Sequence, residues 1–380
     1  MLRRCEMIYF DNAATTKFKP YSVRRAAALV MKNGANPGRG SHKDAIKGAV
    51  IVEETRCAIA SFLHADDANV VFTKNCTEAL NLAILGTAKL GGHVITTSLE
   101  HNSVLRPLHM LEKEGLISLT IIEPRNGRIS ASQVENAIRE KSYLVAVTSM
   151  SNVTGYTPPL REIGDVSEKH GLLFLVDGAQ GIGHIPIDAS EMHMDLLCGA
   201  GHKALHGLQG TGFLVYDKGV YINPIMYGGT GTESERLTQP SAPPESLESG
   251  TLNLPGISGL REAVLWSKRN AVKLNEKVTA ISEYLFRELL KIEGIRLHSV
   301  QGSPIVTFSS TKTDSSIIAN ELNEKYDIAV RYGLHCAPLA IKGVPSVRIS
   351  IDVNNTFSQA CYFVRSLKRI LSEKNQQERP

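Results

Sequence analysis

The stretch LLFLVDGAQG, residues 172–181, contains an unbroken apolar run that ends in an aspartate and a turn with two glycines. A continuous run of this kind is typical of a strand that is buried on both faces of a parallel sheet. Similar runs occur at NVVFTKNC (69–76), HVITTSLEHN (93–102), LVAVTSMSN (144–152) and MDLLCGAGHK (194–203). Because helical patterns alternate with these runs, the sequence predicts an α/β domain built on a large, mainly parallel sheet.

The last third of the chain has a different organisation. Residues 228–255 are polar and rich in Gly, Ser and Pro, which predicts a long loop and a domain border, and residues 257–294 read as a long helix. Beyond it, strands are expected near 295–300, 304–310, 328–333 and 346–351, and helices near 315–326 and 357–374. We therefore expect a large α/β domain over residues 16–255 and a small α+β domain over residues 1–15 and 256–380.

Composition excludes several classes of function. The chain has 380 residues, and its 42 Lys and Arg against 38 Asp and Glu give a net charge of only +4, without a basic run that would favour nucleic acid. Its apolar runs are too short for a signal peptide or a membrane span, so a cytoplasmic location is expected. Six cysteines are scattered without a C-x-x-C pair, which indicates reduced thiols rather than disulfides or a zinc ribbon.

Polar residues follow the predicted strands, at the sheet edge where open α/β proteins bind ligands. Asp177 and Lys203 are the most informative of them, because a carboxylate and a confined lysine suit pyridoxal phosphate: the lysine can hold the aldehyde and the carboxylate the ring nitrogen. The helix start NCTEALNLAI offers N–H donors for a phosphate, with Thr77 adding a hydroxyl. Simple helix capping by Asn75 and Glu78 explains the same stretch equally well.

Two other motifs resemble ligand sites only in part. His202 and His206 have the spacing of a helical metal pair but lack an acidic partner and a third ligand, so no metal site is expected. The glycines of GLQGTG do not match the dinucleotide pattern, which disfavours NAD. Arg348, inside the apolar run SVRISI, is either an exposed strand residue or a bidentate ligand for a substrate carboxylate.

Nine motifs, taken in chain order, resemble those of one family. They are DNAATT, NCTEALN, EHNS, SNVTG, VDGAQ, GHK, SGTLN, RYGLHCAP and VRISI. The chain is similar over residues 8–370 to the class V, fold type I enzymes that use pyridoxal phosphate, specifically the cysteine desulfurases. The VDGAQ and GHK pair and the R-x-G-x-H-C loop are its most specific parts. The loop is similar to that of the Suf-type group, which includes selenocysteine lyase activity.

The resemblance implies a role for each matched residue. Lys203 corresponds to the lysine that bonds the cofactor, Asp177 to the partner of the ring nitrogen, and His101 to the residue that stacks on the ring and moves protons. The resemblance also implies that Gln180 contacts the ring hydroxyl. The phosphate is implied to contact Cys76, Thr77 and His202 of the same subunit and Thr251 of a neighbouring subunit. For the substrate, Arg348 is implied to bind the carboxylate, with Asn152, Asn12 and Ala14 lining the pocket.

The implied reaction converts L-cysteine to L-alanine and leaves its sulfur on Cys336 as a persulfide, for delivery to an acceptor protein or small thiol. An obligate homodimer is implied as well. Selenocysteine lyase and a class V aminotransferase, which has no use for Cys336, remain alternatives. A scaffold protein without catalytic activity is disfavoured, because the chain has a charged residue at every position where the family uses one to bind the cofactor.

Three departures from the family pattern stand out. Ala200 replaces a Ser or Thr three residues before the lysine, Cys76 replaces a common Thr, and one residue is missing between Cys336 and Pro338. In RYGLHCAPLA, residues 331–340, an extended chain would direct His335 and Cys336 to opposite sides, so His335 need not be the base of the thiol. Arg331 is expected to favour the thiolate if the loop folds back.

Overall fold

The computed structural model describes residues 7–37 and 40–377, which form two compact units. Unit 1 contains residues up to 18, residues 150–156 and residues from 270 onward, and unit 2 contains 19–149 and 157–269. Each unit has its own apolar core. The chain passes from one unit to the other between residues 18 and 19 and between residues 269 and 270. The sequence placed the domain borders between residues 15 and 16 and between residues 255 and 256, and those borders stay a prediction.

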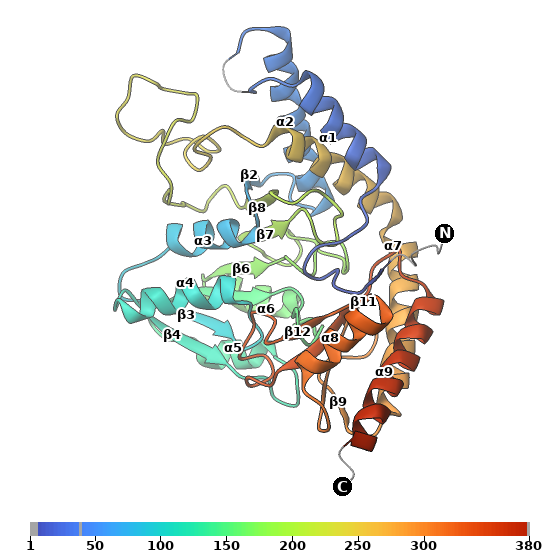
Figure 1. Ribbon diagram of the computed structural model, residues 1–380. Coiled ribbons are helices and arrows are strands. Elements are labelled where there is room, and N and C mark those ends of the chain that lie inside the picture. Colours follow the sequence, from blue (N-terminus) through green and yellow to red (C-terminus); the bar gives the residue numbers. More distant parts are fainter. Residues whose placement is uncertain (1–6, 38–39, 378–380) are drawn as a thin grey trace. The chain divides into compact units, whose positions relative to one another are not determined.

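Unit 2 is built on a seven-stranded sheet with the order β2-β8-β7-β6-β5-β3-β4, which Figure 1 shows as a stack from β2 down to β4. Its strands are β2 (Asn69–Thr73), β3 (Gly92–Thr97), β4 (Ile117–Ile122), β5 (Ser142–Thr148), β6 (Leu173–Asp177), β7 (Leu196–Ala200) and β8 (Gly212–Tyr216). All neighbouring pairs are parallel except the two that involve β8. The prediction of an α/β fold with a mainly parallel sheet is confirmed.

Helices cover this sheet, since strands buried on both faces need apolar partners on each side. They are α1 (Tyr21–Asn33), α2 (Lys43–Phe62), α3 (Cys76–Gly86), α4 (Asn102–Lys113), α5 (Ala131–Ala137), α6 (Leu160–Lys169) and the first part of α7 (Leu254–Leu290). The expectation that a helix follows every strand is wrong for β6 and β7, which lead into turns. Those two turns carry Asp177, Gln180 and Lys203 to the carboxyl edge of the sheet.

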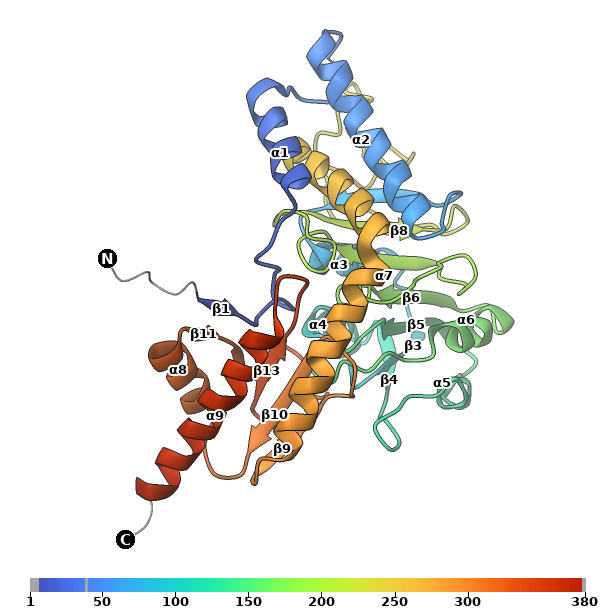
Figure 2. The same ribbon diagram turned by 90° about the vertical axis from the view of Figure 1, so that its right-hand side faces the viewer.

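Unit 1 is an α+β assembly, as predicted. A four-stranded sheet has the order β12-β13-β10-β9, and β1 pairs with β11 in a separate two-stranded sheet. The strands are β1 (Ile8–Tyr9), β9 (Ile295–Leu297), β10 (Ile305–Ser310), β11 (Ile328–Ala329), β12 (Arg331–Gly333) and β13 (Ser346–Ser350). Figure 2 shows α8 (Ser315–Tyr326), α9 (Phe357–Gln377) and the second part of α7 around these strands, and all three supply buried apolar residues to its core.

The long loop and the helices conform to the sequence pattern. Residues 228–253 contain no helix or strand, and α7 begins at Leu254, close to the predicted start.

Among the described residues, none of the helices has both the length and the apolar composition needed to cross a membrane.

Candidate active site

Asp177 ends β6 and is 4% exposed. Its Oδ1 accepts a hydrogen bond from the Ala179 N–H at 2.9 Å and one from the Cys76 thiol at 3.5 Å. The Ser149 hydroxyl donates to the Asp177 carbonyl at 2.8 Å and accepts from the Gly181 N–H at 3.1 Å. The turn that holds Asp177 and the buried Gln180 is therefore fixed to the end of β5.

Lys203 lies in the turn after β7, and its charge acts on both Cys76 and His202. Burial, together with the charges of Lys203 and Lys19, lowers the pKa of His202 to about 4. His202 is therefore neutral at pH 7. The turn requires glycine at Gly201, because a Cβ there would meet the Thr211 hydroxyl at 2.2 Å.

The start of α3 combines capping with donors for an anion. Asn75 Oδ1 accepts from the Glu78 N–H at 2.9 Å, and Glu78 Oε2 accepts from the Lys74 N–H at 2.6 Å. The capping interpretation is thus confirmed. The N–H groups of Cys76 and Thr77 belong to the first turn, where a helix offers no internal acceptor, so the phosphate interpretation stays a prediction compatible with the cap.

A chain of hydrogen bonds links Thr77 to His101. The Thr77 hydroxyl is 2.8 Å from the Ser103 hydroxyl, which is 2.9 Å from His101 Nδ1. The Ser103 N–H also donates to Nδ1 at 3.1 Å, so Nδ1 is the acceptor and the ring proton of a neutral His101 lies on Nε2. Sequence reasoning missed Ser103, although it belongs to the EHNS motif.

Glu100 is a second buried carboxyl group in unit 2 that the sequence did not single out. Its Oε1 accepts from the Thr97 hydroxyl at 2.6 Å. Burial raises the pKa of Glu100 to about 8, and the charge of Asp177 reinforces the rise. Glu100 is therefore mostly protonated at pH 7, and it adds little negative charge beside Asp177.

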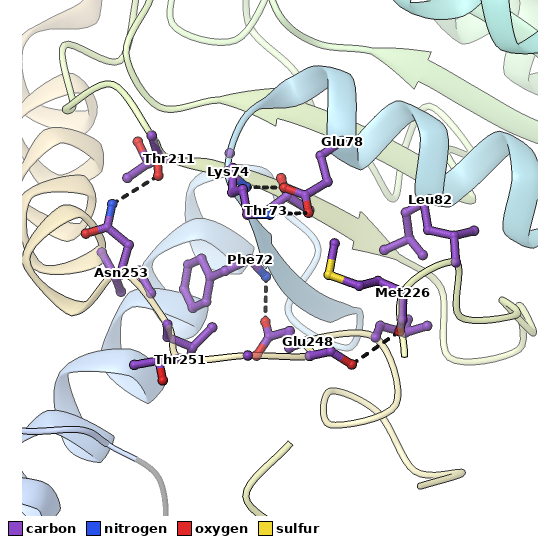
Figure 3. Close-up of a pocket in the computed structure, with 18 residues that line it drawn as sticks. Phe72, Thr73, Lys74, Glu78, Leu82, Thr211, Met226, Glu248, Thr251 and Asn253 are labelled. Carbon is purple, nitrogen blue, oxygen red and sulfur yellow. Dashed lines mark hydrogen bonds and ion pairs between the residues drawn. The ribbon is translucent and has the colours of Figure 1, made fainter. Parts of the chain in front are cut away.

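Thr251 lies on the long loop, beside a pocket of about 430 Å³ in unit 2. Figure 3 shows Glu248, on the same loop, bonded to the backbone N–H of Phe72 on β2, a contact of 2.5 Å. Arg56 holds the same carboxylate through bonds of 2.9 and 2.7 Å. Asn253 donates to the Gly210 carbonyl at 3.0 Å, so the segment that carries Thr251 is anchored on both sides.

In unit 1, Arg348 lies on β13 and is 2% exposed, which excludes the alternative of an exposed strand residue. It donates to the Asn152 carbonyl at 3.1 Å and forms an ion pair of 3.0 Å with Asp11. Burial lowers the pKa of Arg348, and the ion pair opposes that effect. Asp11, in the DNAATT motif, is a partner that sequence reasoning missed.

Cys336 is exposed, on the loop after β12. The predicted extended conformation is wrong, because His335 and Cys336 have φ values of 53° and 57°, in the left-handed region. His335 is buried instead: its Nε2 is 3.0 Å from the Ser346 hydroxyl, and the Asn152 amide donates to its carbonyl at 2.7 Å. The side chain of His335 thus anchors the loop through Ser346.

Three buried polar atoms around this loop lack a hydrogen-bond partner within the part of the chain that the structure describes. They are Nε of Arg348, Oδ1 of Asn152 and Nδ1 of His335. Buried polar atoms are rarely left unpaired, so this cluster is suited to a small polar ligand. Asn12 also stabilises the fold, because its amide donates to the Ser350 carbonyl at 3.0 Å, and Ala14 lies half-buried in the same segment.

Comparisons with known proteins agree with this geometry. The pattern of the family "Aminotransferase class-V" matches residues 8–363. The chain belongs to this family. A cysteine desulfurase IscS from Rickettsia felis is 33% identical over 352 residues, which cover 88% of this chain and 80% of the relative.

Solved structures of cysteine desulfurases have the same fold. The apo structure of the enzyme from Thermococcus onnurineus NA1 has a TM-score of 0.89 at 29% identity and covers 97% of this chain and 95% of its own. The cysteine desulfurase CsdA of Escherichia coli has a TM-score of 0.86 at 27% identity, with the same coverage. The chain is thus a class-V enzyme of the cysteine desulfurase branch.

For a class-V enzyme, unit 2 offers a chemically suitable set of groups for pyridoxal phosphate. A lysine and a buried carboxylate lie near Cys76, Nδ1 of His101 accepts from the Ser103 N–H, and α3 begins directly after β2. A Cβ on Gly212 would approach the Asn75 backbone to 2.4 Å, so β8 packs closely against that helix start. Ala200, the first departure, is buried at the end of β7 and adds no hydroxyl.

Proposed function

We propose that the protein is a pyridoxal phosphate-dependent cysteine desulfurase, which converts L-cysteine to L-alanine and takes up the sulfur on Cys336. The observation that carries this proposal is the exposed Cys336 thiol, on a loop whose His335 and Asn152 contacts connect it to the buried Arg348. A class-V aminotransferase needs no such thiol.

Unit 2 supplies the residues for the cofactor. When bound there, pyridoxal phosphate would supply an electron-withdrawing group for the Cα of the amino acid. Lys203 anchors the aldehyde and then moves the Cα proton, Asp177 holds the ring nitrogen protonated, and His101 covers the ring. The ring hydroxyl is assigned to Gln180, and the phosphate to the N–H groups of Cys76 and Thr77, the Thr77 hydroxyl and His202.

Unit 1 supplies the residues for the substrate. Arg348 binds the carboxylate of cysteine, using Nε and the part of the guanidinium shared with Asp11. Asn152, Asn12 and Ala14 line the amino-acid site. Holding the substrate in one orientation brings its sulfur to the Cys336 thiolate, and such positioning contributes a large part of a catalytic barrier.

The sulfur transfer balances without an external oxidant. The Cys336 thiolate attacks the substrate sulfur, an S–S bond forms, and the substrate Cβ–S bond breaks with its electron pair moving to carbon. Protons from Lys203 and the site complete alanine, so one thiol and one cysteine yield one persulfide and one alanine. The persulfide then passes to an acceptor protein or a small thiol.

The assembly and location are also part of the proposal. We infer a cytoplasmic homodimer in which Thr251 reaches the phosphate of the other copy, and no metal, nucleic acid or membrane partner. The anchoring of the Thr251 segment by Glu248 and Asn253 supports a fixed position for that residue.

The test measures alanine, sulfide and keto acid from L-cysteine, with a reductant that releases persulfide sulfur. Wild type is expected to form alanine and sulfide in equal amounts, and Cys336→Ala to lose both. Cys57→Ala is the matched control, because Cys57 is also exposed but lies within α2.

Other outcomes would replace the proposal. Activity on selenocysteine with none on cysteine would indicate a selenocysteine lyase. Keto acid formation that survives Cys336→Ala would indicate an aminotransferase. A wild-type protein with no absorption band for bound pyridoxal phosphate, after the cofactor has been added, would contradict every pyridoxal-dependent function.

A further inference from the structure

The carboxylate of Asp177 has an asymmetric environment. Both of its hydrogen-bond donors, the Ala179 N–H at 2.9 Å and the Cys76 thiol at 3.5 Å, reach the same oxygen, Oδ1. The described residues thus leave Oδ2 to accept from a further donor. A carboxylate held through one oxygen presents the other in a fixed direction, which is what a protonated ring nitrogen requires.

The Cys76 side chain is oriented toward Asp177 although its backbone begins α3. It is buried in the core of unit 2 beneath the sheet edge, where Cys198 of β7 also lies. Burial raises the pKa of the Cys76 thiol well above its ordinary value, and Asp177 raises it further. The group is therefore an S–H donor at neutral pH, and it donates a hydrogen bond to the carboxylate.

We infer that Cys76 is a positioning residue for Asp177: its thiol turns the carboxylate so that Oδ2 meets the ring nitrogen of the cofactor, and it does not bind the phosphate. The inference rests on the proposed function, because it needs pyridoxal phosphate in unit 2. It also assigns a purpose to the departure at this position, where a thiol replaces the common hydroxyl. The phosphate is left with the backbone N–H groups of α3, the Thr77 hydroxyl and His202.

The test compares affinities of the apoprotein for three compounds, so that no catalytic turnover is involved. The compounds are pyridoxal phosphate, pyridoxal, which lacks the phosphate, and the analogue of pyridoxal phosphate in which C–H replaces the ring nitrogen. The variants are Cys76→Ala, which removes the donor, and Cys76→Ser, which keeps one. Cys198→Ala is the matched control, because Cys198 is equally buried and near Asp177 but does not donate to it.

Cys76→Ala is expected to weaken binding of pyridoxal phosphate and of pyridoxal by the same factor, about three- to tenfold, the range for one hydrogen bond. The carbocyclic analogue should bind equally well to wild type and Cys76→Ala. Cys76→Ser should restore most of the affinity, and Cys198→Ala should leave it unchanged. Melting temperatures of the apoproteins separate a loss of packing from a loss of ligand contact.

Two results would overturn the inference. If Cys76→Ala weakens pyridoxal phosphate but leaves pyridoxal unaffected, the thiol serves the phosphate. If the variant binds all three compounds like wild type, the thiol has no role toward Asp177. Either result leaves the proposed function standing, whereas wild-type protein that fails to bind pyridoxal phosphate removes the proposed function itself.

Discussion

Each unit contains a buried charged residue that lies beside a titratable residue of the same charge type. In unit 2, Asp177 lies near Glu100, whose pKa burial raises to about 8. In unit 1, Arg348 lies near His335, whose pKa burial lowers to about 3. The second group is largely neutral at pH 7 in both cases, so it adds little charge beside Asp177 or Arg348.

The two sites differ in how that charge is held. Arg348 has an ion pair with Asp11 and a carbonyl acceptor, but its Nε is buried without a partner. Asp177 is held by a backbone N–H and a thiol, both on one oxygen. Under the proposed function, Asp177 meets the protonated ring nitrogen of the cofactor in unit 2, and Arg348 meets the carboxylate of the substrate in unit 1.

The most severe change in unit 2 is Lys203→Ala. We expect alanine release from cysteine to fall by about 10²- to 10⁴-fold, the contribution of a positioned group that transfers a proton. Steady-state assays of alanine measure the loss, with the exposed Lys218→Ala as control. Activity within twofold of wild type would show that Lys203 is not the central lysine of the site.

The next largest effect is expected in unit 1, from Arg348→Lys. A lysine keeps the charge but cannot reproduce the planar set of donors, so the KM for cysteine should rise about 10- to 100-fold with a smaller change in kcat. Arg296→Lys, on the exposed strand β9, is the matched control. An unchanged KM would remove Arg348 from the substrate site.

Glu100→Gln tests the neutral acid of unit 2. The folded-state pKa is raised above the unfolded value, so the stability that Glu100 contributes is complete below about pH 4.5 and is lost as pH rises toward 8. Glutamine stays neutral and can still accept from Thr97. Between pH 5 and 7 the variant should therefore gain about 1.4 kcal/mol per pH unit relative to wild type in urea unfolding.

The control for this experiment is the exposed Glu114→Gln, which should follow the wild-type profile. If the free energies of unfolding of wild type and Glu100→Gln changed with pH in parallel, Glu100 would be ionised in the folded protein. In that case Glu100 would add a second negative charge beside Asp177, and the two units would no longer share a neutral titratable group beside the buried charge.

His335→Asn tests the neutral imidazole of unit 1. Here the stability contributed by the side chain changes with pH in the direction opposite to that for Glu100. The folded-state pKa is lowered, so the stability contributed by His335 is complete above about pH 6.5 and is lost as pH falls toward 3. From pH 6.5 to 5.5 wild type should lose about 1 kcal/mol more than the variant. Asparagine is chosen because it tolerates the left-handed conformation at this position.

His64→Asn is the control, since His64 also has a positive φ of 52° but is exposed. A wild-type profile as flat as that of His335→Asn would contradict the account of a buried neutral imidazole. Unfolding followed by fluorescence at a series of pH values measures all of these profiles.

Much of the fold could be predicted from local pattern. The apolar runs placed five strands of unit 2, and the predicted helix over 315–326 coincides with α8. Strand β8 was missed because its five residues follow a glycine-rich stretch, and periodicity does not reveal strand direction. Strand β4 was missed because it lies at the sheet edge, where its residues are only partly buried.

The site was predicted less completely, for a physical reason. The Cys76 and Asp177 contact joins residues 101 positions apart, and the Arg348 and Asp11 ion pair joins residues 337 positions apart. Local pattern carries no information on such pairs. The left-handed conformation of His335 and Cys336 was equally hidden, because residues other than glycine rarely adopt it. The Suf-type assignment and the individual roles of the site residues remain predictions.

The central claim is that Cys336 receives the sulfur of cysteine. It is tested most directly by mixing the enzyme, loaded with pyridoxal phosphate, with one equivalent of L-cysteine and mapping the product by peptide mass spectrometry under non-reducing conditions. The account predicts that the peptide with Cys336 gains one sulfur atom while one alanine per site is released, and that the peptide with Cys57 is unchanged. Alanine released in that amount with no added sulfur on Cys336 would contradict it.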